Sequence, residues 1–142
     1  MFSELQEFSK MNTQNHVLNQ LSIKTLKAHQ TEFKRPNIIF LSILTSCGNL
    51  AGYIILFVEK RTNIIHLKRI LVDENHLGIG IGVRALLAME TYCLSELKAN
   101  RVWLDVFKSN EKALHIYQKL GYKVFKKGME NCRHVLFYEK KL

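Results

Sequence analysis

The sequence predicts an α+β fold: a mixed, mostly antiparallel sheet with one central parallel βαβ unit and flanking helices. Three β-rich runs in the first half are joined by connections of a few residues, which force neighbouring strands to pair antiparallel. A stretch of helical period then separates the third run from a fourth, and so long a crossover makes that pair parallel. With 142 residues, the chain has the size of a single domain, residues 1–142.

The first elements expected along the chain are helical. Apolar residues recur at roughly helical spacing from about residue 13 to residue 31, and Asn12 or Thr13 could cap this segment. We therefore expect one or two modest helices there, ended by Pro36. The β-branched and apolar runs that follow predict strands at residues 38–44, 50–59 and 64–73.

A glycine-rich turn at residues 78–82 opens the second half of the chain. Leu86, Met89 and Cys93 recur at helical spacing after it and predict a helix that reaches residues 99–100. The remaining elements are a strand at residues 101–107, a helix from Ser109 or Asn110 to Leu120 closed by Gly121, and strands at residues 122–126 and 132–139.

The chain is strongly basic, with a formal net charge of +9 and a pI near 9.6. A positive field attracts anionic ligands, so nucleic acid, acidic protein surfaces and polyphosphate cofactors are all candidates. The sequence has no interleaving of aromatic and basic residues and no helix-turn-helix pattern, so no nucleic acid is expected. A non-catalytic basic module that binds nucleic acid or a protein remains the alternative to an enzyme.

No apolar run reaches the length that crosses a bilayer, and residues 1–10 lack the pattern of a signal peptide. We therefore expect a cytoplasmic protein without a membrane partner. Cys47, Cys93 and Cys132 lie far apart and are odd in number, which argues against disulfides and against a zinc site.

The glycine-rich turn is the strongest chemical signal. Gly78, Gly80 and Gly82 alternate directly before a helix, so the backbone can approach a ligand closely. The free N–H groups and the dipole of the first helical turn favour an anion, which predicts a phosphate site. The alternative is a tight turn without any ligand.

A dinucleotide site also fits part of this pattern. Residues 80–85 match the G-x-G-x-x-G/A fingerprint, and Asp105 lies about 20 residues further on, where a ribose-binding acid would be expected. However, the preceding strand ends near Val72, so the glycines do not follow it directly. The antiparallel runs before the turn also leave no sequence for a doubly wound parallel sheet.

Residues 70–82 resemble the cofactor motif of the GNAT superfamily of acetyl-CoA-dependent N-acetyltransferases, and residues 102–110 are similar to the strand after its cofactor helix. Residues 110–122 then resemble the family's Asn-x6-Tyr-x3-Gly-Phe/Tyr helix. The similarity covers about residues 64–124. The resemblance implies a GNAT-like fold and an acyltransferase that passes an acetyl group directly to an amine. Within the superfamily, the sequence most resembles the ribosomal-protein alanine (protein N-terminal) acetyltransferases.

The resemblance also implies a site for acetyl-CoA as co-substrate. The main chain of one strand would pair with the pantetheine arm, main-chain N–H groups of the turn would hold the diphosphate, and a side-chain amide would contact the cofactor. Leu77 and Ile79 stand where the family often has Arg, Gln or a basic residue, with Arg84 as a candidate cation. The implied cofactor residues are Ile70, Leu71, Val72, Leu77, Gly78, Ile79, Gly80, Ile81, Gly82, Val83 and Asn110.

Two residues are the catalytic candidates. The resemblance places Tyr117 near the thioester sulfur as general acid, with an ordinary helix aromatic as the alternative. Asp105 is the candidate base, because strand alternation puts it between Trp103 and Phe107, where desolvation would strengthen its hold on a proton. A structural acid paired with a cation is its alternative, and Glu59 and His66 are alternative bases.

The acceptor follows less directly from the sequence. The family acetylates both peptide N-termini and small-molecule amines. A basic protein repels polyamines at long range, which favours a neutral or acidic acceptor such as a peptide N-terminus. The sequence also allows the protein to form a homodimer.

Overall fold

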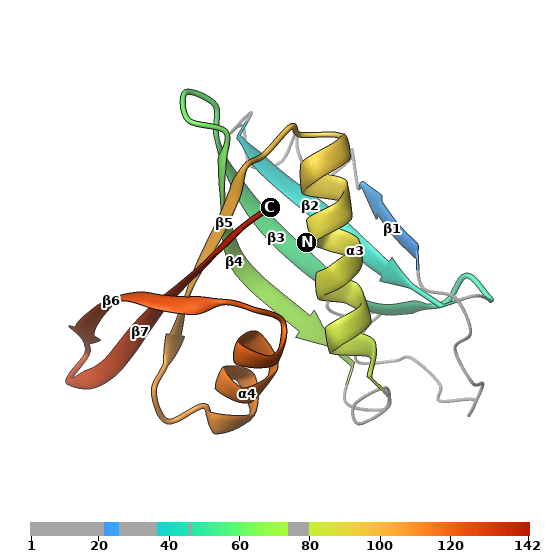
Figure 1. Ribbon diagram of the computed structural model, residues 1–142. Coiled ribbons are helices and arrows are strands. Elements are labelled where there is room, and N and C mark those ends of the chain that lie inside the picture. The colour runs from blue at the N-terminus through green and yellow to red at the C-terminus, as the bar shows by residue number, and fades with distance from the viewer. Residues whose placement is uncertain (1–21, 26–36, 46, 74–79) are drawn as a thin grey trace.

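The computed structural model describes residues 22–25, 37–45, 47–73 and 80–142. Within them a seven-stranded sheet has the order β1-β2-β3-β4-β5-β7-β6 and is joined by two helices (Figure 1). The elements are β1 Ser22–Thr25, β2 Ile38–Leu44, β3 Leu50–Glu59, β4 Ile64–Val72, α3 Ile81–Ser95, β5 Arg101–Phe107, α4 Glu111–Lys119, β6 Lys123–Glu130 and β7 Arg133–Lys141.

The pairing confirms the expected α+β architecture. Strands β1 to β4 form an antiparallel meander, β4 and β5 are the parallel pair, and β7 lies antiparallel between β5 and β6. The helix α3 provides the long crossover between the parallel strands. A sheet with this many antiparallel neighbours is not doubly wound, so the dinucleotide interpretation of the glycines is wrong.

The expected helices at residues 13–31 need a correction, because Ser22–Thr25 is a strand. It pairs with β2 from Ser22↔Leu44 to Thr25↔Leu41. The segment reads Ser-Ile-Lys-Thr, and its β-branched residues suit an extended chain. Pairing along the edge of β2 overrides the helical spacing of the residues around it, and those other residues lie outside the described part of the chain.

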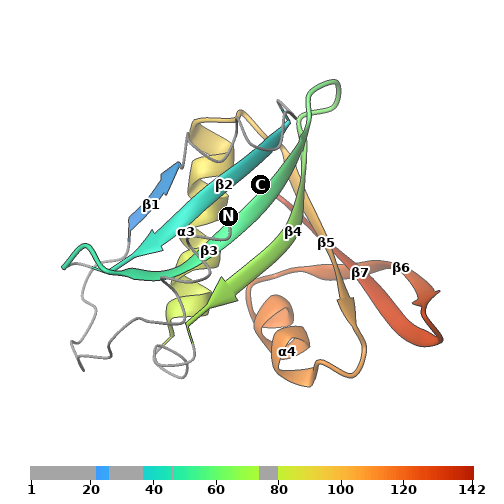
Figure 2. The same ribbon diagram turned by 180° about the vertical axis from the view of Figure 1, so that it is seen from behind.

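The helix α3 covers one face of the sheet. It lies in front of the strands β2 and β3 in Figure 1 and behind them in Figure 2. Its buried side chains join those of β2 to β5 in one core, and burying each large one contributes about 1.5–3 kcal/mol. The buried residues of α3 are Ile81, Ala85, Leu86, Met89, Glu90 and Cys93. Neither described helix has the length and apolar character to cross a membrane.

The parallel strands β4 and β5 separate soon after they begin. They pair only from Ile64↔Arg101 to His66↔Trp103. Beyond that point β5 follows β7, while β4 stays with β3 to its end. The two strands therefore diverge toward α4, as the lower part of Figure 1 shows.

Gly52 keeps β3 close to β4 at the end of this split. It pairs with Val72, and a Cβ atom there would collide with the carbonyl oxygen of Leu71. A larger residue at this position would push β4 away from β3 and move its last residues.

Candidate functional site

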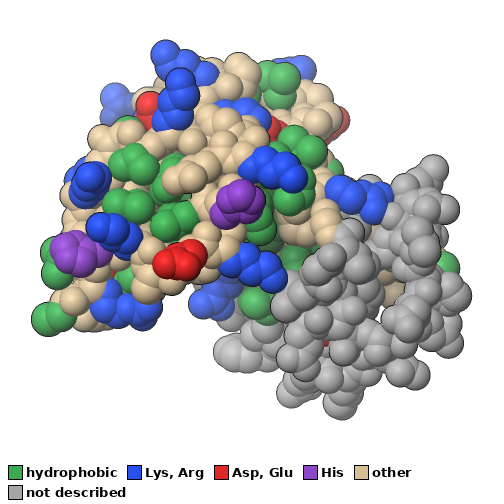
Figure 3. Space-filling model, turned by 60° about the horizontal axis from the view of Figure 1, so that its bottom comes forward, with side chains coloured by type: hydrophobic (Ala, Val, Ile, Leu, Met, Phe, Trp, Pro, Cys, Tyr) green, Lys and Arg blue, Asp and Glu red, His purple; other side chains and the backbone are tan. Residues whose placement is uncertain are grey.

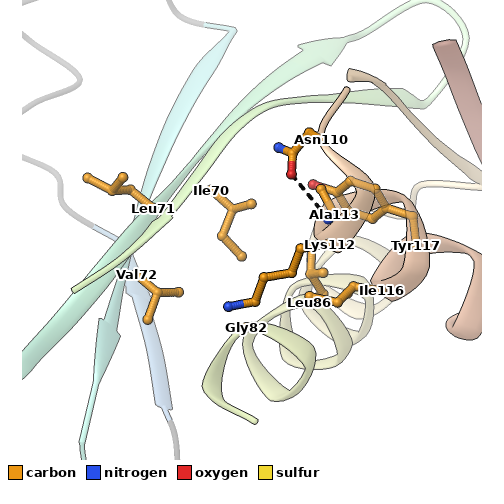
Figure 4. A pocket seen from close by; sticks show the side chains of 10 residues that line it. All are labelled: Ile70, Leu71, Val72, Gly82, Leu86, Asn110, Lys112, Ala113, Ile116 and Tyr117. Atoms are coloured by element: carbon orange, nitrogen blue, oxygen red, sulfur yellow. Dashed lines mark hydrogen bonds between the residues drawn. The ribbon is translucent and has the colours of Figure 1, made fainter. Parts of the chain in front are cut away.

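A cavity of about 360 Å³ lies where β4 and β5 diverge. Figure 4 shows it between the end of β4, the start of α3 and one side of α4. The residues that line it are Ile70, Leu71, Val72, Gly82, Leu86, Asn110, Lys112, Ala113, Ile116 and Tyr117. Six of the sequence-predicted site residues therefore meet in one place: Ile70, Leu71, Val72, Gly82, Asn110 and Tyr117.

The β4 side of the cavity is a free strand edge. Ile70, Leu71 and Val72 pair with β3 on one side, and on the β5 side no strand among the described residues pairs with them. Backbone N–H and C=O groups on such an edge can bind an extended ligand as an added strand would. The sequence-based expectation for the pantetheine arm concerns these same three residues.

The start of α3 presents backbone to the cavity. Gly80 is the N-cap in the left-handed conformation, with φ 78°, and it offers no side-chain cap to the first turn. A Cβ atom on Gly82 would meet nothing within 4 Å, so space stays open above its backbone. The first turn of α3 carries no acidic residue. Its N–H groups and dipole are therefore available to an anion.

The other predicted residues of this turn divide into two groups. Ile81 and Val83 belong to the first turn of α3, and the Ile81 side chain is buried in the core, so only the main chain of Ile81 is available for binding. Leu77, Gly78 and Ile79 lie outside the described residues.

Asn110 caps the helix α4, in addition to any contact with a ligand. Its side-chain oxygen accepts a hydrogen bond of 3.3 Å from the Ala113 N–H and caps α4 (Figure 4). This confirms Asn110 as the helix cap. The amide NH₂ remains able to donate.

Tyr117 is 8% exposed and packs edge-on against Tyr122, with ring centroids 5.7 Å apart. Burial raises the pKa of the Tyr117 hydroxyl to about 12, and the nearby negative charge of Asp105 adds to the shift. Tyr117 is thus both a core residue and part of the cavity lining. None of the described residues hydrogen-bonds to its hydroxyl, which is left as a donor toward the cavity.

Tyr122 lies behind Tyr117 and is held differently. Its hydroxyl donates to one oxygen of Glu90 at 3.0 Å, and Lys140 donates to the other at 2.7 Å. Burial raises the pKa of Tyr122, and the charge of Glu90 and the hydrogen bond to it raise it further. This network ties α3 to the C-terminal strand β7.

Asp105 lies on the same face of β5 as Trp103, as strand alternation predicted, because His66 contacts both side chains. Its carboxylate is 3.0 Å from Nε2 of His66, and His66 stacks on Trp103 with centroids 3.7 Å apart. The Asp105 side chain is 36% exposed, so it remains open to solvent beside its aromatic neighbours. Its closest partner is a histidine and not the Lys or Arg of the structural alternative.

His66 is the more enclosed member of this pair. Burial lowers its pKa, against the hydrogen bond and the negative charge of Asp105, which both raise it, while Lys68 lowers it further. A neutral His66 donates its Nε2–H to the carboxylate. This leaves the Nδ1 lone pair as an acceptor.

A second cavity of about 350 Å³ opens beside His66. It is lined by Phe57, Glu59, Ile64, His66, Lys68 and Trp103. Both alternative bases from the sequence, Glu59 and His66, belong to this lining. Asp105 lines neither cavity, but it bonds to His66 of the second and its charge reaches Tyr117 of the first.

Four lining residues of the first cavity were not predicted as site residues from the sequence: Leu86, Lys112, Ala113 and Ile116. Helical spacing could have found them, because Leu86 follows Gly82 by four residues and the others share one side of α4 with Tyr117. Arg84, the predicted cation, is not part of the lining. Lys112 provides a positive charge there instead.

No group of His, Cys, Asp and Glu side chains in the described part of the chain could hold a metal ion. Cys93 is buried in the core, as its helical position predicted, while Cys47 and Cys132 are exposed free thiols.

Comparison with known proteins connects this geometry to a family. Residues 4–122 match the family model for the acetyltransferase (GNAT) family. The chain is 30% identical over 81 residues to the spermine/spermidine N(1)-acetyltransferase of Bacillus subtilis (strain 168), which covers 53% of each protein. It is 38% identical over 56 residues to the spermidine N(1)-acetyltransferase of Escherichia coli (strain K12), over 39% of this chain and 30% of that protein. The match thus spans about half the length of the first relative and less of the second.

The fold is shared with a solved structure. Spermidine N-acetyltransferase from Vibrio cholerae, crystallised in complex with CoA and spermine, superposes with a TM-score of 0.75 at 15% identity. The match covers 86% of this chain and 95% of that one. The two relatives and the solved structure above are named for polyamines, which corrects the expected closeness to the ribosomal-protein alanine acetyltransferases. The matching motifs concern the cofactor and therefore carry little information about the acceptor.

Proposed function

The chain belongs to the acetyltransferase (GNAT) family, and from this premise we propose that it transfers an acetyl group from acetyl-CoA directly to a small-molecule amine. The observation that carries the proposal is the cavity in the split between β4 and β5, with Tyr117 in its wall. A free strand edge, an uncapped helix start and a buried phenol meet there. A non-catalytic basic module would have no need of that combination.

The cavity suits the chemical parts of acetyl-CoA. The β4 edge at residues 70–72 offers backbone groups to the amide-containing pantetheine arm. The start of α3, with open space above Gly82, suits the diphosphate. Bound acetyl-CoA supplies an activated acyl group as a thioester. In the transfer the amine nitrogen bonds to the acyl carbon and the C–S bond breaks. A base must accept the amine proton, and a donor must stabilise the negative charge that develops on the sulfur.

Tyr117 is the proposed donor to the leaving sulfur. Its hydroxyl stays protonated at neutral pH, since its pKa lies near 12. An ordinary thiol has a pKa of about 8.5, so Tyr117 first acts as a hydrogen-bond donor that stabilises the developing charge. It acts as a full acid only when its pKa falls.

Asp105 is the proposed base, and it couples the two halves of the reaction. The carboxylate receives the amine proton through a bridging water, because it lines neither cavity. Once protonated, it no longer contributes the negative charge that raises the pKa of Tyr117. Accepting the first proton therefore makes Tyr117 a better acid when the sulfur needs a proton. His66 acts as a positioning residue through its 3.0 Å hydrogen bond.

The acceptor is proposed to approach from the face of the second cavity, next to Asp105. Phe57 and Trp103 offer apolar surface there, and Glu59 offers a negative charge. Lys68 opposes part of that charge, and the net charge of +9 repels polycations at long range. A monoamine or a short diamine with an apolar body fits this lining better than a long polyamine.

The test is a screen of acceptors with purified protein, saturating acetyl-CoA and a free-thiol readout. Monoamines, diamines, spermidine, spermine and peptides with free N-termini are compared by kcat/KM. We expect small amines with apolar groups to exceed the peptides. Binding is measured separately, since acetyl-CoA at 100 times its Kd raises the free energy of unfolding by about 2.7 kcal/mol. No thermal shift and no thiol release with any amine would refute the proposal, and a preference for peptides would reassign the acceptor.

A further inference from the structure

Lys112 occupies an unfavourable position in its own helix. It is the second residue of α4, Glu111–Lys119, where the positive end of the helix dipole repels a cation. A local cost of this kind is often kept where a residue serves a site. Lys112 lines the first cavity, while Lys119 at the other end of α4 does not.

The Lys112 side chain extends across the cavity. Figure 4 shows its side chain extending from α4 toward the first turn of α3, with the nitrogen between Val72 and Gly82. Within the described residues, no carboxylate pairs with it. The start of α3 has no acidic residue and no side-chain cap, so its helix N-terminus and the Lys112 ammonium converge on the same space, whereas α4 begins with the Asn110 cap and Glu111.

The wider surface has the same sign. Figure 3 views the end of the molecule that carries α4 and the start of α3, and Lys and Arg side chains prevail there over Asp and Glu. Such a field favours a ligand with several negative charges over one with a single charge. A diphosphate carries those charges in a form that backbone N–H groups and an ammonium can share.

We propose that Lys112 binds the diphosphate of acetyl-CoA and provides the side-chain charge that Leu77, at the family's usual Arg or Gln position, cannot provide. The inference rests on the proposed function and adds the cation of the same site. The turn that begins α3 holds the diphosphate from one side through main-chain N–H groups. Lys112 reaches it from α4 on the other side. Lys112 is thus a binding residue for the phosphates and has no part in the transfer of the acetyl group.

The test measures Kd by calorimetry for the wild type and Lys112→Met with three ligands: CoA, dephospho-CoA and pantetheine. Dephospho-CoA retains the diphosphate and lacks the 3′-phosphate, while pantetheine lacks both. We expect Lys112→Met to bind CoA and dephospho-CoA about ten- to hundredfold more weakly, as for loss of a charge-assisted contact. Binding of pantetheine should not change. Lys112→Arg should recover most of the affinity, and the control Lys119→Met should bind all three ligands as the wild type does.

Each other outcome overturns the assignment. Loss of affinity for CoA but not for dephospho-CoA would move Lys112 to the 3′-phosphate. An equal loss for pantetheine would show that the substitution disturbs the cavity itself. Unchanged affinity for all three ligands would remove Lys112 from the site. A wild-type protein that binds none of them would refute the proposed function, and this result requires no variant, so the two failures are distinguishable.

Discussion

Two neighbouring tyrosines, one in α4 and one just after it, differ in the hydrogen bonds that their hydroxyls make. Tyr117 in α4 and Tyr122 just after it are both buried, and their rings touch edge to face. The Tyr122 hydroxyl is fixed by Glu90, which Lys140 also binds. The Tyr117 hydroxyl has no hydrogen-bond partner in the described part of the chain and borders the cavity.

This difference separates stability from chemistry. A buried polar group with all partners in place stabilises a fold, because unpaired partners are costly to bury. A hydroxyl that borders a cavity without a protein partner is free to bond to a ligand there. Tyr122 thus belongs to the framework that joins α3 to β7, and Tyr117 belongs to the site. Substituting each tyrosine by phenylalanine removes the same atom from two different roles.

The largest effect is expected for Tyr117→Phe. Loss of a general acid costs about 10²–10⁴-fold in rate, so kcat should fall by at least about a hundredfold. Kd for acetyl-CoA and the melting temperature should change little, because the hydroxyl has no described protein partner. Steady-state kinetics with calorimetry check this. Turnover close to that of the wild type would leave Tyr117 as a packing residue.

The next effect is expected for Asp105→Asn. Asparagine keeps the size of the side chain and removes the base, so kcat should fall by about ten- to a hundredfold. This loss is smaller than that for Tyr117→Phe because water can partly replace the carboxylate as the proton acceptor. The variant should also lower the pKa of Tyr117, since one cause of its rise is the Asp105 charge. The pH profile of kcat checks both points. The matched control for Asp105→Asn is His66→Gln, which keeps a hydrogen-bond donor to Asp105. An equal loss of kcat in the two variants would assign the base to His66.

The smallest effect on rate and a clear effect on stability are expected for Tyr122→Phe. The change leaves a Glu90 oxygen without its donor and should lower the free energy of unfolding by about 1–3 kcal/mol. Its kcat should stay within about twofold. Chemical denaturation and kinetics on the same preparation measure both.

The pH dependence of that stability gives a second readout. Folding raises the pKa of Tyr122 above its ordinary value of 10.0, so the unfolded chain loses this proton first. The stabilisation is complete below pH 10 and is lost as pH rises toward the folded pKa. Tyr122→Phe should therefore flatten the alkaline loss of stability. An equally steep loss in the variant would place its cause elsewhere.

The elements that depend on local pattern were predictable from the sequence. The strands at residues 38–44, 50–59 and 101–107 have the predicted bounds, because β-branched and apolar runs between turns determine them locally. Asn110, one of the two predicted caps, is the residue that caps its helix, since a cap needs only the next three residues. The strand Ser22–Thr25 was missed because its reason lies in the edge of β2, about 20 residues away in the chain.

By itself, the sequence determined the order of strands and helices from residue 38 onward and the one parallel crossover, and its resemblance to the GNAT superfamily implied cofactor residues in β4, α3 and α4. The order of the elements follows from periodicity within a few residues, whereas the cofactor residues follow from the resemblance. The tertiary structure alone decided that His66 meets Asp105 across 39 residues, that Tyr122 and not Tyr117 bonds to Glu90, and that Lys112 and Gly82 line the same cavity. Those contacts depend on where β4 and β5 separate and how α4 fills the gap, and that packing sums many weak long-range contacts that no local pattern encodes.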